Sequence, residues 1–232
     1  MKKVIHFTKT FSNVSSILNS SSLRLKYCQE EFELGDNKIS QAAHPMVCFS
    51  KLDINLLSKM KITYGRYGIA FNDDWVHRNK IHPVLYFDRE SALANALAKL
   101  LRARQNQENS KLPDSLRLPI MILKCFTKNA NGYNRRLKVK DFNFADESEW
   151  RFVPSKKDIS NGLISQNLSA YLKSRDAHNR KLLPFPLRFT RGDISKIFVA
   201  TKAEVKLLEN MGFSGSLVSV SRWKTDDSQR QI

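Results

Sequence analysis

The sequence predicts an α+β domain in which many short strands and several helices follow one another irregularly. Apolar runs of about five residues, rich in strand-forming side chains, recur along the chain, as at residues 67–71. Between them lie segments whose apolar residues are three and four positions apart, which is the spacing of a helix. The long, regular strand–helix alternation of a doubly wound sheet is not found.

The N-terminal half is expected to open with a strand at 4–8 and a short helix at 11–18, with Ser12 as its N-cap. Residues 23–27 alternate apolar and polar side chains, which is typical of a half-buried strand. Further strands are predicted at 46–50, 67–71 and 84–87, helices at 53–61, 73–79 and 89–104, and a polar loop at 35–43.

In the C-terminal half, Thr201 and Glu204 have the spacing of a capping box, which predicts a helix from there to about residue 211. We expect one domain over residues 1–225, with 156–225 as an additional α+β part, and a frayed tail at 226–232. The other predicted elements are strands at 120–126, 137–142, 149–153, 196–200 and 217–220, a helix at 163–174, and loops at 105–115 and 128–134.

The composition limits the class of protein. The chain has 232 residues and 41% apolar residues, which is enough for a real core. Its longest apolar runs fall short of the roughly 18 residues that a membrane-spanning helix needs. We see no secretory signal, and three cysteines without C-x-x-C spacing argue against a disulfide framework and a zinc site. A soluble, cytoplasmic protein without a metal is expected.

The net charge of +17, from 39 Lys and Arg against 22 Asp and Glu, is the strongest compositional signal. Basic surfaces bind nucleic acid because neutralising phosphates releases counterions. An acidic protein partner is an alternative, and an anionic membrane surface is the weakest one. Residues 99–140 hold eleven cations against two acids. The predicted nucleic-acid-binding residues are Arg102, Arg104, Arg135, Arg136 and Lys138.

Two short motifs are candidates for chemistry, since phosphate-loop, dinucleotide, zinc-protease and nucleophile-elbow signatures are missing from the sequence. The first is His6-Phe7-Thr8, at the end of the first predicted strand. The second is Glu147-Ser148-Glu149, whose carboxylates would point the same way on a strand. Two carboxylates on one face repel each other, so they persist if they are solvated, paired with Arg151, or used.

The order of His6, Tyr27 and Glu149 resembles the His-Tyr-Glu arrangement of ADP-ribosyltransferases. The opening His6-Phe7-Thr8, followed by a short helix and Leu23-Arg24, is similar to the DarT-type toxins that modify nucleic acid. This resemblance implies an ADP-ribosyltransferase-like core of short strands with peripheral helices.

A second resemblance covers more of the chain and is to the AbiGi family, which is associated with abortive infection, a phage-defence strategy. Its motifs are P-M-V-C-F-S at 45–50, Y-G-R-Y-G-I-A-F at 64–71, Trp75, P-V-L-Y at 83–86 and D-E-S-E-W-R at 146–151. Both resemblances together span about residues 1–155. The AbiGi family has been described as an antitoxin, which conflicts with catalysis; we give the acidic and histidine positions more weight.

The transferase resemblance implies NAD as co-substrate and gives roles to five residues. Glu149 would stabilise the developing positive charge on the ribose, and Glu147 would orient or deprotonate the nucleophile. His6, with Thr8 nearby, would bind the adenosine-side ribose. Tyr27 would stack on nicotinamide, although Tyr64, Tyr67 and Tyr86 are competitors for that role. Which glutamate is essential stays open.

The leading hypothesis is therefore an NAD-dependent ADP-ribosyltransferase toxin for phage defence, acting on RNA or single-stranded DNA and neutralised by an antitoxin protein. Its main rival is a non-catalytic, antitoxin-type member of the abortive-infection family, which binds nucleic acid or an acidic partner through its basic surface. A third hypothesis is an NAD-hydrolysing enzyme of the same fold.

Overall fold

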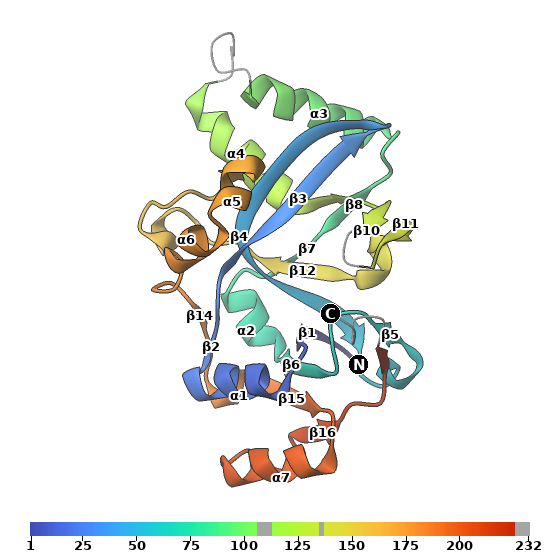
Figure 1. The fold of residues 1–232 in the computed structure, drawn as a ribbon, viewed down its shortest axis with the longest axis vertical. Coiled ribbons are helices and arrows are strands. Elements are labelled where there is room, and N and C mark those ends of the chain that lie inside the picture. Colours follow the sequence, from blue (N-terminus) through green and yellow to red (C-terminus); the bar gives the residue numbers. More distant parts are fainter. Residues whose placement is uncertain (106–112, 135–136, 226–232) are drawn as a thin grey trace. The chain divides into compact units, whose positions relative to one another are not determined.

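The computed structural model in Figure 1 describes residues 1–105, 113–134 and 137–225. Helices and strands are mixed along the chain, as the α+β prediction requires. The chain forms two compact units, and strand β4 (Asn37–Asp53) contributes to both. None of the described helices is long and apolar enough to cross a membrane. The first unit comprises Met1–Leu23, Cys48–Ile81 and the chain from Leu187 on; the second comprises Arg24–Val47 and His82–Pro186.

The first unit is built on a sheet in the order β16-β15-β6-β1-β4, in which β4 takes part through its C-terminal end. Strand β1 (Lys2–Thr8) is antiparallel to both neighbours, with Ile5 opposite Ser50 and Ala70. Strand β6 (Tyr67–Phe71) is buried almost throughout, which explains its continuous apolar run. Ile5, Ala70 and Phe198 pack with Trp223 in one core cluster.

Helices and further strands complete the first unit. Helix α7 begins with the predicted capping box: the Thr201 hydroxyl accepts from the Glu204 amide, and the Glu204 carboxylate accepts from the Thr201 amide. The elements are α1 (Phe11–Ser20), β2 (Ser22–Leu23), β5 (Lys61–Ile62), α2 (Asp73–Arg78), β14 (Leu187–Arg188), β15 (Ile194–Val199), α7 (Lys202–Asn210), β16 (Val218–Val220) and β17 (Lys224–Thr225), with 3-10 turns at Leu57–Lys59 and Arg191–Asp193.

Two predictions for this unit were wrong in detail. The N-cap of α1 is Thr10 rather than Ser12, because the Thr10 hydroxyl is the group that accepts from the Asn13 amide, at 3.2 Å. The helix predicted at 53–61 is only the 3-10 turn Leu57–Lys59. Leu57 and Ile62 are buried in the core cluster, and these tertiary contacts override the local helical spacing.

The second unit is dominated by the hairpin of β3 (Lys26–Leu34) and β4. Leu34 pairs with Asn37, so the turn consists of Gly35 and Asp36 alone. Gly35 has a φ of +55°, which a two-residue hairpin turn accepts readily from glycine. The loop predicted at 35–43 is therefore wrong beyond the turn, because residues 37–43 belong to strand β4 and pair with β3.

Figure 1 shows helices α3 and α4 near one another in this unit, and they are in contact. One face of α3 packs on Phe32 of β3. The elements of the unit are β7 (His82–Pro83), β8 (Leu85–Phe87), α3 (Ala92–Gln105), α4 (Asp114–Cys125), β9 (Thr127–Asn129), β10 (Asn131–Asn134), β11 (Val139–Asn143), β12 (Glu149–Phe152), β13 (Gln166–Asn167), α5 (Leu168–Lys173) and α6 (Arg175–Arg180), with 3-10 turns at Phe144–Glu147 and Lys157–Ile159.

Helix α4 corrects the strand predicted at 120–126. The apolar run looked like a buried strand, but Ile120, Met121, Lys124 and Cys125 are buried while Ile122 and Leu123 are exposed. Burial in pairs three to four residues apart is helical spacing, and contact with α3 selects the helix. Three further predictions were inaccurate: the strand at 23–27 is interrupted before β3, the loop at 128–134 is largely β9 and β10, and the helix at 163–174 is confined to α5.

Candidate functional site

The two acidic residues of the E-x-E motif meet at one lysine in the second unit. Glu147 ends a 3-10 turn and Glu149 begins β12, so the two do not share a strand as expected. Ser148 between them adopts a left-handed φ of 43°. Both carboxylates nevertheless reach Lys128 of β9, whose Nζ lies 3.2 Å from each.

Arg151 holds Glu149 from the other side. Its Nε donates to Glu149 Oε1 at 2.8 Å, and its Nη2 donates to Oε2 at 3.1 Å. Nη2 also donates to Glu30 Oε1 at 2.9 Å, and Nη1 donates to the Cys125 carbonyl at 2.6 Å. Arg151 is fully buried, so this planar fork is satisfied entirely by protein groups.

Glu30, Lys128, Glu147, Glu149 and Arg151 together form what we call the Arg151 network. It contains three carboxylates and two cations, and the side chains of Glu147 and Glu149 are only 6% and 7% exposed. Burial by itself would lower the pKa of Lys128, but the three carboxylates outweigh it and raise that pKa above its usual range. Lys128 also lies 4.3 Å from the centre of the Phe144 ring.

The Tyr86 hydroxyl also contacts the network. The Glu149 amide donates to the Tyr86 hydroxyl at 3.0 Å. Burial, together with the nearby carboxylates, raises the pKa of Tyr86 to about 12, although the bond from the Glu149 amide acts in the opposite direction. Tyr86 therefore stays a neutral phenol and orients the start of β12.

A second buried polar contact lies at His44 and Lys124. His44 Nδ1 must donate to the Ile164 carbonyl, at 3.0 Å, because that oxygen can only accept. Its Nε2 then accepts from Lys124 Nζ at 3.2 Å. Burial and the Lys124 charge lower the pKa of His44 to about 3, and burial lowers the pKa of Lys124 to about 8. Burial likewise raises the pKa of the Cys125 thiol to about 12.

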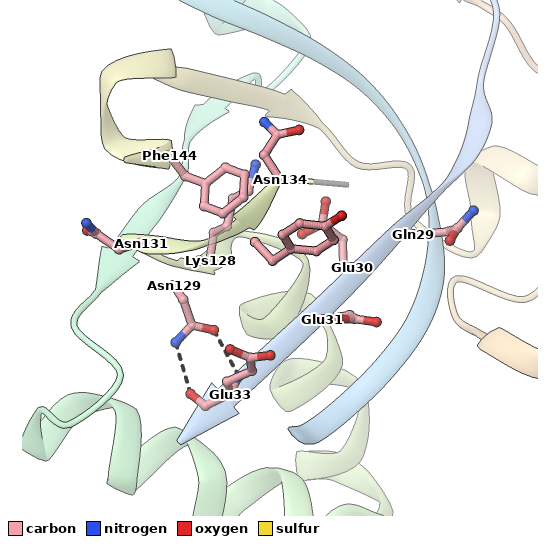
Figure 2. Close-up of a pocket in the computed structure, with 11 residues that line it drawn as sticks. Gln29, Glu30, Glu31, Glu33, Lys128, Asn129, Asn131, Asn134 and Phe144 are labelled. Atoms are coloured by element: carbon pink, nitrogen blue, oxygen red, sulfur yellow. Dashed lines mark hydrogen bonds between the residues drawn. The ribbon is translucent and has the colours of Figure 1, made fainter. Parts of the chain in front are cut away.

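A pocket of about 210 Å³ opens beside the network, between β3 and the β9–β10 segment (Figure 2). Glu30 and Lys128 line it, whereas Glu147 and Glu149 do not. Asn129 in its wall is already engaged, since its amide donates to the Glu33 carbonyl and accepts from the Glu33 amide, both at 2.9 Å. Its volume lies below the ~300 Å³ at which ordinary small-molecule sites begin.

The predicted ribose-binding residues lie in the first unit. His6 Nδ1 is 3.0 Å from the Cys48 carbonyl, and its ring meets Phe49 edge to face at 5.7 Å. Thr8 accepts a hydrogen bond from the Asn13 amide group at 3.0 Å.

Tyr27, the predicted nicotinamide-stacking residue, belongs to the second unit and is buried. Its hydroxyl donates to the Leu163 carbonyl at 2.6 Å, and its ring lies against Tyr171 and His178. Among its competitors, Tyr67 donates to Glu204, and Tyr64 packs against the core of the first unit.

The predicted nucleic-acid-binding cations have different surroundings. Arg102 and Lys138 are exposed, whereas Arg104 is half-buried and donates through Nε to the Arg117 carbonyl at 3.2 Å. Arg135 and Arg136 lie outside the described residues. Within the same basic stretch, Lys124 is buried and Lys128 is neutralised by carboxylates. Part of the sequence's positive charge is therefore internal.

Sequence reasoning missed most of the Arg151 network. The pairing of Glu149 with Arg151 was one of the alternatives, because residues two apart on a strand share a face. The roles of Glu30 and Lys128 had no local signal, since they lie 121 and 21 residues from their partners. Within the described ranges, no group of three or more His, Cys, Asp and Glu side chains could hold a metal ion.

Comparison with known proteins gives one match, to a family model. The model is described as "Putative abortive phage resistance protein AbiGi, antitoxin", and it matches residues 21–200. No curated protein and no solved structure matches the chain. The matched region contains the whole Arg151 network and both helices α3 and α4. Because the match covers most of the chain, the protein belongs to the AbiGi family of abortive phage resistance proteins.

Proposed function

We propose that this protein is the antitoxin of an abortive-infection pair and that it acts by binding its toxin, without a catalytic step of its own. The family description supports an antitoxin. The proposal depends on the bidentate ion pair of Arg151 and Glu149, in which both carboxylate oxygens accept from the buried guanidinium. A carboxylate held in this way is already neutralised, so it is poorly suited to stabilise an oxocarbenium ion.

The competing hypothesis is the ADP-ribosyltransferase toxin. It requires Glu149 to exchange Arg151 for the ribose of NAD, and Tyr27 to leave the Leu163 carbonyl and stack on nicotinamide. Breaking one partner out of a buried charged pair costs roughly 3–5 kcal/mol. The residues present therefore fit a structural network better than an NAD site, and the wild-type chain is expected to transfer nothing.

The first test is enzymatic. Purified protein is incubated with NAD labelled on the adenine-side phosphate, together with total RNA, single-stranded DNA and cell extract. We expect no label on any macromolecule and no NAD consumption, for the wild type and for Glu149→Gln alike. Label that appears with the wild type and disappears with a folded Glu149→Gln variant would establish the transferase and refute the proposal. NAD loss without label would establish the hydrolase.

The second test is biological and uses the protein encoded beside this chain at its native locus as the toxin. Expressed alone, the chain is expected to leave bacterial growth unchanged, whereas the neighbouring protein alone arrests it. Co-expression should restore growth, and the two proteins should elute together on size exclusion. Growth arrest by the chain alone, or an arrest by its neighbour that co-expression does not relieve, contradicts the antitoxin function.

A further inference from the structure

A pocket of about 570 Å³ lies in the first unit, and all the described residues that line it belong to that unit. They come from the segment before and within the 3-10 turn Leu57–Lys59, from β15, from the start of α7, and from β16 and the residues just after it. The volume falls within the ~300–1,000 Å³ of ordinary small-molecule sites, unlike that of the pocket beside the Arg151 network. We call it the β16 pocket.

The buried residues that line this pocket are apolar, and we call them its floor: Leu57, Phe198 and Trp223, which are only 3–7% exposed. All three belong to one core cluster of the unit. The Trp223 ring meets Phe198 edge to face at 5.3 Å, and its Nε1 donates to the Gly65 carbonyl at 2.9 Å. Val220, which is half-buried, adds to the apolar lining. Because these contacts fix the floor in the free chain, a ligand does not have to order it.

The charged residues of the β16 pocket are both cations. Lys202, the first residue of α7, and Arg222 line it and are exposed, and none of its described lining residues is acidic. The pocket beside the Arg151 network is the opposite, since three glutamates line it and its lysine is paired with carboxylates. In a chain with a net charge of +17, uncompensated cations in a pocket raise the local concentration of anions.

Carboxylates close in sequence to the lining are engaged elsewhere. Among the described residues these are Asp53 and Glu204. Asp53 Oδ1 accepts from the ammonium group of Met1 at 2.7 Å. The Glu204 carboxylate accepts from the Thr201 amide and from the Tyr67 hydroxyl, both at 2.9 Å. Within the described ranges neither cation of the pocket forms an ion pair, so both can receive an anionic ligand.

The remaining polar residues of the lining are short and uncharged. Asn55 and Ser58 are exposed, and Ser219 is half-buried. Lysine, arginine, serine and asparagine are side chains that contact phosphate and sugar oxygens in nucleic-acid complexes. A few such groups in a largely apolar pocket fix the orientation of a small ligand. The lining therefore suits a ligand with an apolar ring, hydroxyl groups and an anionic end.

We propose that the β16 pocket binds a nucleoside monophosphate. The phosphate group lies at Lys202 and Arg222, the sugar hydroxyls bond to the serine and asparagine side chains, and the base packs on the apolar floor. Both ends of the ligand contribute, because the cations supply charge-assisted hydrogen bonds and the floor removes ring surface from water. The inference concerns the first unit and does not depend on toxin binding.

The experiment is isothermal titration calorimetry of the full chain at low ionic strength. The ligands are AMP, GMP, CMP and UMP, with inorganic phosphate and the free nucleosides for comparison. We expect at least one nucleotide to bind at one molecule per chain, with a Kd roughly tenfold or more below those of phosphate and of its nucleoside. Added salt should weaken binding of the nucleotide and leave that of the nucleoside unchanged.

The double variant Lys202→Gln/Arg222→Gln removes both cations of the pocket and should raise the nucleotide Kd roughly tenfold or more. The matched control is Lys206→Gln/Arg66→Gln, which removes two exposed cations of the same unit that do not line the pocket. Its Kd should stay within about twofold of the wild-type value, because solvent screens distant charges. Ser58→Glu places a carboxylate in the lining and should also weaken nucleotide binding. Circular dichroism and urea unfolding verify that each variant is folded.

The proposal is refuted if none of the four nucleotides binds to the folded wild type. Equal affinity for a nucleotide and for inorganic phosphate would overturn it as well, because the apolar floor would then take no part. An equal loss in the control variant would assign the binding to net charge rather than to the pocket. RNA that binds where mononucleotides do not, and is lost in Lys202→Gln/Arg222→Gln, would assign the two cations to nucleic acid instead. The antitoxin function is tested separately, by the co-expression experiment.

Discussion

The Arg151 network and the exposed surfaces of helices α3 and α4 belong to the same unit, yet they distribute polarity in opposite ways. In the network, five charged side chains pair with one another; Glu147, Glu149 and Arg151 are buried, and Glu30 and Lys128 are 12% and 17% exposed at the wall of the pocket. On the two helices, six large apolar side chains are 38–64% exposed: Leu93, Leu100, Leu116, Leu118, Ile122 and Leu123. Buried charges are stable only when they are paired, whereas exposed apolar side chains are common on folded proteins. Replacing a residue of the network should therefore destabilise the chain more than replacing one of the exposed apolar residues.

The largest effect is expected from breaking the network at its centre. Arg151→Met removes the buried guanidinium that pairs with both Glu30 and Glu149, so the free energy of unfolding should fall by about 3–5 kcal/mol. Urea unfolding measures the loss. Arg89→Met is the control, because that side chain is 28% exposed and its ion pairs are 3.9–4.0 Å long; it should lose less than about 1 kcal/mol. Equal losses would show that the network is not the stabilising feature.

The buried histidine should make stability depend on pH. The pKa of His44 is about 3 in the folded chain and near 6.5 when unfolded, so between these values only the unfolded chain binds the proton. The contribution to stability is complete above pH 6.5 and is lost as the pH falls towards 3, with a slope of up to about 1.4 kcal/mol per pH unit. His44→Gln should flatten the profile between pH 6.5 and 4. The exposed His77→Gln should not, and a matching change in that variant would rule out His44 as the source.

A smaller effect is expected from removing one charge but keeping the shape. Glu149→Gln preserves one acceptor for Arg151 and should cost about 1–3 kcal/mol of unfolding free energy. Glu31→Gln on β3 is the comparison, because its carboxylate is 23% exposed and pairs with Lys38 at 3.5 Å. That variant should change stability by less than about 1 kcal/mol. A Glu149→Gln protein as stable as the wild type would indicate a carboxylate that is free to serve another purpose.

The smallest stability effect is expected at an exposed residue of α4. Ile122→Ser should change the unfolding free energy by no more than about 0.5 kcal/mol, because the side chain is 42% exposed. Ile120→Ser, two residues earlier and 6% exposed, should cost about 2–5 kcal/mol. Thermal or urea unfolding of the two variants measures this difference in unfolding free energy. A large loss at Ile122 would mean that this residue already packs within the chain.

The comparison also explains which predictions from sequence were accurate. Strand β6, helix α2 and the capping box of α7 were predicted at or near their observed bounds, because each depends on residues within one short segment. The errors at α4 and at the turn Leu57–Lys59 occur where distant packing competes with local spacing. The sequence identified the two acidic residues of the candidate site but did not predict the ion pairs that hold them. Glu147 and Glu149 were found by their spacing, whereas Lys128 and Glu30 were not.

The sequence by itself determined the α+β class, the excess of positive charge, the E-x-E pair and the membership of the AbiGi family. Each of these depends only on which residues are present and on their spacing over short segments. Only the tertiary structure decided that Glu149 is held by Arg151 and Glu30 by the same guanidinium, that Lys124 is internal, and that Ile122 faces outward. The physical reason is that burial and ion pairing depend on distances between side chains far apart in the chain. The protonation and the partners of a charged side chain depend on its burial and on the groups around it.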